Sequence, residues 1–120
     1  MKLITLVNAH NVLDDFAEQE GIGAHLAYWM TKFVVKTQAD SDFYQANVRK
    51  QFEKYGVPDA DGKLVVPLDK LSDFSKAIEN LQNTEVEDPG VRFSLTELSR
   101  ELKLSMKQMY PLLDFIDEEK

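Results

Sequence analysis

The sequence predicts a mostly α-helical domain with a minor β component (α+β): a long helix with an antiparallel partner helix, a β-hairpin arm and short strands. Apolar residues recur three or four positions apart over residues 24–55 and again over 68–83, the period of an amphipathic helix. Between them, Asp61-Gly62 is typical of a tight turn joining two short extended pieces. A length of 120 residues favours a single domain over residues 1–120.

The first residues favour a strand followed by a helix. KLITLV, residues 2–7, is apolar and rich in β-branched side chains, as short strands are. Asn8 or Asn11 can then cap a helix. Gly21 and Gly23 are expected to end that helix.

The apolar stripe of residues 24–55 contains a polar gap, TQADSD, at residues 37–42. Its members are Leu26, Met30, Phe33, Tyr44, Val48, Phe52 and Tyr55. The segment is either one long helix whose gap faces solvent, or two helices that meet at a cap near Ser41. We predict one helix, which stops at Tyr55-Gly56.

A second amphipathic helix is expected from about Leu68 to Asn83. Its apolar stripe can pack antiparallel against residues 44–55 of the long helix. This pair of helices is the predicted core of the protein.

Two short strands are expected around the turn Asp88-Pro89-Gly90. TEVE, residues 84–87, lies before the turn and VRFS, residues 91–94, lies after it. Ser94 or Thr96 can open a final helix as its cap. The acidic tail DEEK, residues 117–120, is expected to be solvated and frayed.

The composition indicates a soluble, acidic, cytoplasmic protein. Hydrophobic residues make up 43% and charged residues 29% of the chain, which is enough for a core and a wet surface. No apolar run approaches the roughly 20 residues of a membrane span, and the start turns acidic too early for a signal peptide. The absence of cysteine excludes disulfides. A net charge of −7 with evenly mixed bases makes nucleic-acid binding unfavourable.

No metal site is predicted, although Asp59-Ala60-Asp61-Gly62 resembles a calcium loop. A calcium loop that begins at Asp59 needs glycine at its sixth position and glutamate at its twelfth. Those positions hold Leu64 and Lys70. We therefore interpret the segment as an ordinary turn.

Neither a catalytic site nor a cofactor site is predicted. His10 and Asp14 have the i, i+4 spacing that places two side chains on one helix face, but further ligands have no obvious source. His10 and His25 are expected at the surface or at helix caps. No hydroxyl has an arguable basic partner, and no glycine-rich phosphate loop is present. We therefore predict a protein that is not an enzyme.

Residues 94–113 have the rhythm of a helix-turn-helix, with two short helices around residues 103–105. Four apolar side chains would pack them together: Leu98, Leu102, Met109 and Leu112. Pro111 interrupts the second helix, and the acidic DFIDEE that follows would repel phosphates. Helical packing is therefore favoured over DNA reading.

Several methionines and aromatic residues can serve either as core or as an adaptable partner-binding surface. Trp29 is the informative one, because an exposed tryptophan is evidence for an interface. The predicted partner-binding residues are Tyr28, Trp29, Met106, Met109 and Tyr110.

The order of six segments resembles a family of small uncharacterised proteins encoded by temperate phages of Gram-positive bacteria. The segments are AYWMTK, RKQFEKYG, DADGKLVVP, DFSKAIENLQN, TEVE and LLDFIDEE. The matching positions are Ala27 and Tyr28, Lys54 to Gly56, Asp59 to Gly62, and Thr84 to Glu87. The first 23 residues and QADSDF depart from the family pattern. The resemblance implies a phage origin and a host cytoplasm, and it carries over no catalytic residue.

The predicted function is non-enzymatic protein binding. The first hypothesis is a phage accessory or morphogenesis protein that assembles with itself, as a homo-oligomer, or with another phage protein. An inhibitor of a host defence protein, such as a CRISPR nuclease, is the alternative. The third hypothesis is a small helix-turn-helix-like regulator that uses residues 94–113.

Overall fold

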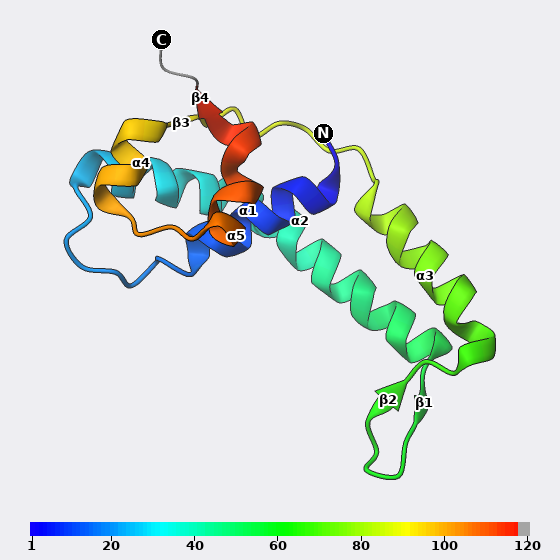
Figure 1. Cartoon of the computed structure of the whole chain (residues 1–120). Coiled ribbons are helices and arrows are strands. Elements are labelled where there is room, and N and C mark those ends of the chain that lie inside the picture. The colour runs from blue at the N-terminus through cyan, green and yellow to red at the C-terminus, as the bar shows by residue number, and fades with distance from the viewer. Residues whose placement is uncertain (118–120) are drawn as a thin grey trace.

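The computed structural model describes residues 1–117 and is mostly helical, as predicted (Figure 1). In chain order its elements are α1 (Leu3–Asp14), α2 (Ala24–Tyr55), β1 (Val57–Pro58), β2 (Leu64–Val65), α3 (Leu68–Gln82), β3 (Phe93–Ser94), α4 (Leu95–Glu101), α5 (Met106–Met109), the 3-10 helix η1 (Tyr110–Phe115) and β4 (Ile116–Asp117). The long helix α2 leaves a body formed by the two ends of the chain and continues into a projecting arm (Figure 1). We define the arm as residues 43–83.

The predicted strand at residues 2–7 is wrong, because α1 begins at Leu3. Only Lys2 stays extended, in a single bridge with Glu85. The apolar residues of this segment recur at helical spacing and are buried: Leu3, Leu6, Val7, Ala9 and Leu13. Burial along one face thus overrides the β propensity of the side chains. The helix also ends earlier than expected, at Asp14 rather than at Gly21.

Residues 24–55 form one helix, as predicted, but its polar gap does not face solvent. Thr37 and Ser41 are fully buried, and both lie on the stripe that the apolar residues define. The Thr37 hydroxyl donates to the Phe33 carbonyl at 2.8 Å, so its polar group is satisfied inside the protein. Small polar side chains therefore continue the buried face at this point.

The core lies in the body, and the prediction that the α2–α3 pair forms it is wrong. The buried cluster draws on α1, the first half of α2, α4, η1 and the chain around β3: Ala9, Leu13, Leu26, Met30, Phe33, Val91, Phe93, Leu98, Leu102, Leu112 and Phe115. No residue of α3 is buried. Two helices cover each other on one side only, so a third layer is needed to close a core around them.

The arm itself has the predicted arrangement. Helix α3 runs antiparallel to the last half of α2, with the rings of Phe52 and Phe74 4.8 Å apart and Gln82 Nε2 donating to the Tyr44 hydroxyl at 3.3 Å (Figure 1). The antiparallel hairpin β1–β2 joins the two helices, and Val57 pairs with Val65. Its turn uses Gly62 at φ +80°, a conformation that favours glycine.

The strands expected around Asp88–Gly90 do not pair with each other. Glu85 bridges to Lys2, whereas β3 pairs in parallel with β4 at the end of the chain. The expected helix after them is present, and Ser94 caps α4 by accepting from the Glu97 amide at 3.3 Å. Residues 118–120 of the acidic tail lie outside the described part of the chain.

The molecule is elongated. Its principal extents are 51, 30 and 24 Å, and its radius of gyration is 17.3 Å. A compact domain of this length has a radius of gyration of about 14 Å. The arm accounts for this difference, because it projects from the body without a covering layer (Figure 1).

Candidate interaction surface

Exposed apolar side chains gather at the end of the arm, where α2, the hairpin and the start of α3 meet. We call these six residues the arm tip: Phe52, Val57, Leu64, Val65, Leu68 and Leu71. The exposed fractions of these six residues average one half, and Leu68 is 91% exposed. Single exposed apolar residues are ordinary, but a gathered group marks a place where another molecule binds.

The local structure explains why the tip is apolar yet uncovered. Each strand of the hairpin has two residues, and all four are exposed. A two-stranded hairpin has no opposing sheet to cover it and is marginally stable alone. The Leu64 side chain lies over Gly56, where an added Cβ would come within 3.2 Å of it. Contact with the end of α2 therefore holds the hairpin in place.

The five residues predicted to bind a partner divide into two groups. Tyr28 and Trp29, on the first turns of α2, are both exposed and form an edge-to-face ring pair with centroids 5.1 Å apart. Met106 and Tyr110 are strongly exposed on α5 and at the start of η1, and Met109 is half-buried there. Within residues 1–117, no ring contact joins Tyr110 to the α2 pair. The role of the five residues in partner binding stays a prediction.

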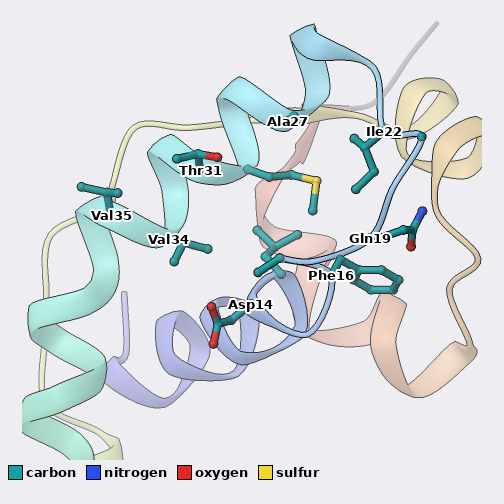
Figure 2. Close-up of a pocket in the computed structure, with 12 residues that line it drawn as sticks. Asp14, Phe16, Gln19, Ile22, Ala27, Thr31, Val34 and Val35 are labelled. Atoms are coloured by element: carbon teal, nitrogen blue, oxygen red, sulfur yellow. The ribbon is translucent and has the colours of Figure 1, made fainter.

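An open pocket of about 280 Å³ lies between the end of α1, residues 15–23 and α2 (Figure 2). Its apolar lining includes Leu13, Phe16, Ile22, Met30, Val34 and Val35. Asp14 and Gln19 are among its polar residues. Sequence reasoning missed this pocket, although Phe16 and Ile22 in an otherwise polar connection were a usable signal. Because its lining is mainly apolar, the pocket offers a place for an apolar group.

No family model, curated protein or solved structure matches the chain. The resemblance to a phage family therefore stays a prediction. None of the helices within residues 1–117 has the length and apolar character needed to cross a membrane.

The expectation of a surface or capping position is wrong for His10, which is buried. Its Nδ1 lies 2.7 Å from Thr37 Oγ1. Because the single hydroxyl proton of Thr37 is donated to the Phe33 carbonyl, the oxygen accepts from His10 Nδ1–H. A polar contact between α1 and α2 thus uses this histidine. His25 is exposed, and its Nδ1 lies 2.9 Å from the Glu97 carboxylate.

The acidic turn of the hairpin uses its first carboxylate internally. Asp59 Oδ1 accepts from the amides of Asp61 and Lys63 at 2.8 and 2.9 Å. Across residues 1–117, no three histidine, aspartate or glutamate side chains gather closely enough to hold a metal ion.

The helix-turn-helix rhythm corresponds to α4, a connection and the four-residue helix α5. Ser105 opens α5 with a capping box, and the chain tightens into η1 where Pro111 lies. Leu98, Leu102 and Leu112 are buried as expected. A single turn of helix is a poor counterpart of a recognition helix, which presents several residues along a major groove.

An ion pair between Asp88 and Arg92 closes the turn of residues 88–92. Hydrogen bonds from the Arg92 guanidinium and from the Gly90 amide lower the pKa of Asp88 to about 2. The same pair, chiefly through the hydrogen bond to Asp88, raises the pKa of Arg92, whose guanidinium lies 5.5 Å from the centre of the Phe115 ring. The contacts of this pair with Gly90 and Phe115 indicate a structural role.

Proposed function

We propose that the protein acts by binding another protein through the arm tip and has no catalytic activity of its own. The observation that carries this proposal is the gathering of six exposed apolar residues on a projecting arm. Full burial of one large apolar side chain contributes about 1.5–3 kcal/mol. Because these side chains are on average half exposed, covering them leaves roughly 1 kcal/mol each to be gained.

The shape of the arm supports the same function. It presents its tip away from the body, so a partner can surround the tip without displacing any core residue (Figure 1). Projecting helical hairpins offer area on several sides, which suits an assembly or morphogenesis protein. In line with the sequence resemblance, we propose a phage accessory role in the host cytoplasm as the biological setting.

A photo-crosslinking residue at position 68 tests the proposal directly. Leu68→p-benzoylphenylalanine places the crosslinker on the tip. Leu95→p-benzoylphenylalanine is the matched control, because Leu95 is the first residue of α4 as Leu68 is of α3, is 44% exposed and lies outside the pocket lining. Irradiation in host cells, with and without phage infection, is followed by mass spectrometry of the adducts. We expect protein adducts from position 68 that position 95 does not give.

The identity of the adduct separates the hypotheses. A second copy of the chain or a phage structural protein supports the assembly role. A stoichiometric adduct with a host nuclease would replace that role with inhibition of a host defence protein. Equal adducts from both positions, or none from position 68, would refute binding through the arm tip.

A further inference from the structure

We infer that the arm tip binds a second copy of this chain, so that two arms pair about a two-fold axis parallel to their length. This inference rests on the proposed function, because it names the partner of the same surface. Three properties of the arm favour this pairing: its net charge, the distribution of that charge across its width, and its uncovered apolar area.

The arm carries none of the protein's net charge. Residues 43–83 contain six acidic and six basic residues, so the charge of −7 belongs entirely to the rest of the chain. Two arms can therefore meet without net charge repulsion between them.

The two limbs of the arm have opposite charge. The α2 limb, residues 43–56, has three basic residues and one acidic residue, a net charge of +2. The α3 limb, residues 57–83, has five acidic and three basic residues, a net charge of −2. A two-fold axis along the arms places each α2 limb against the partner's α3 limb, so one complementary contact occurs twice. Neighbouring helices then run antiparallel throughout, as in a four-helix bundle.

Arg49 and Glu79 are the charges best placed for this contact. Arg49 lies one helical turn before Phe52, and Glu79 lies three turns after Leu68, so each shares a helix face with a tip residue. The pairing of Phe52 with Phe74 and of Tyr44 with Gln82 brackets both charges within the same stretch of the arm. Arg49 of one copy therefore meets Glu79 of the other at the same height.

The apolar area supplies part of the interface that a stable dimer requires. Full burial of a large aliphatic side chain removes roughly 100 Å² of apolar surface from water, so the six tip residues, half exposed on average, leave roughly 300 Å² per copy. A standard interface buries about 800 Å² per partner, more than half of it apolar. We assign the remainder to contacts between the oppositely charged limbs of the two copies.

Sedimentation equilibrium over a range of concentrations, together with light scattering, tests the inference on the full chain. The wild type is expected to reach twice its monomer mass of 13.8 kDa. Leu68→Ser, at a residue too exposed to disturb the fold, is expected to weaken the dimer at least tenfold. Leu95→Ser, at an exposed leucine of the body, is the matched control and should leave the dissociation constant unchanged.

A charge exchange identifies the register. Arg49→Glu alone and Glu79→Lys alone each create two like-charge contacts, and each is expected to weaken its homodimer by about threefold to tenfold at low salt. An equimolar mixture of the two variants restores opposite charges at both contacts. The mixed dimer should therefore be tighter than either homodimer, and high salt should remove the difference.

The outcomes separate this inference from the proposed function. A monomeric wild type whose position-68 crosslinker captures a different protein overturns self-association and keeps arm-tip binding. A monomeric wild type without adducts at position 68 overturns both. A dimer that neither Leu68→Ser nor the charge exchange affects uses another surface, and it also overturns the inference.

Discussion

A pair of leucine-to-alanine variants tests whether the core lies in the body. Leu26 and Leu81 both lie on helices, so the two substitutions change helix propensity equally. Leu26 is completely buried in the body cluster, whereas Leu81 is half-buried between α3 and α2. Leu26→Ala removes buried methyl groups and leaves a cavity, which costs about 3–4 kcal/mol. Leu81→Ala leaves a site open to water and is expected to cost about 1–2 kcal/mol.

Urea unfolding followed by circular dichroism measures both free energies of unfolding. Both variants are made on the Leu68→Ser background, because dimerisation would add a concentration-dependent term to the stability. The slope with urea should stay close to that of the background protein for Leu26→Ala. A cost for Leu81→Ala equal to or larger than that for Leu26→Ala would refute the body as the core and restore the α2–α3 pair.

Three further predictions concern local contacts. Thr37→Val keeps the side-chain shape but leaves the buried Nδ1–H of His10 without an acceptor. We expect the free energy of unfolding, measured with urea, to fall by about 1–3 kcal/mol. Thr37→Ser keeps the hydroxyl, so its loss should be less than half of that. Because the folded pKa of Asp88, about 2, lies below its unfolded value, its contribution is present above pH 4 and disappears as the pH falls to 2. Solvent screening limits that contribution to below about 1 kcal/mol, since the carboxylate is 39% exposed. As the pH is lowered from 4 to 2, the free energy of unfolding should fall less for Asp88→Asn than for the wild type. Equal pH dependences would contradict a stabilising role for the Asp88 carboxylate. Ser94→Ala removes the acceptor for the Glu97 amide at the start of α4 and should cost about 1 kcal/mol, whereas Ser94→Asp, which keeps a capping oxygen, should retain most of the stability.

The pocket beside residues 15–23 and the arm tip are different kinds of surface. The pocket is concave and small, at the low end of ligand sites. The arm tip lies at the end of a projecting arm, so a partner can reach it without entering a cavity. The charge of the limbs and the exposed apolar area of the tip together indicate what would cover it.

Much of the arm was predictable from sequence because its signals are local. The three-to-four spacing over residues 24–55 and 68–82, and the Asp61-Gly62 turn, specify two helices and a hairpin wherever they are placed. Ser94 likewise marks the start of α4 through a contact within one turn. Exposure of the tip was not predictable, because an apolar strand has the same sequence pattern whether or not another layer covers it.

The exposure of Trp29 and of Met106 also depends on the tertiary structure. Helical spacing indicates that Tyr28 and Trp29 cannot both face the core, but it does not place α5 relative to them. The structure leaves both rings exposed on α2 and puts Met106 on a different element.

By itself, the sequence determined the elements of the arm, the net neutrality of residues 43–83 and the opposite charges of the two limbs, since these depend only on residue types and short spacings. Tertiary structure alone decided which faces are buried. Residues 3–7 form a helix because their apolar face packs into the body, and His10 is buried because Thr37 of α2 offers it an acceptor. The parallel pairing of β3 with β4 could not be predicted from the sequence either. Such contacts join residues far apart in the chain. The free energy that they contribute exceeds the helix and strand propensities of the individual residues, which are what a sequence pattern reflects.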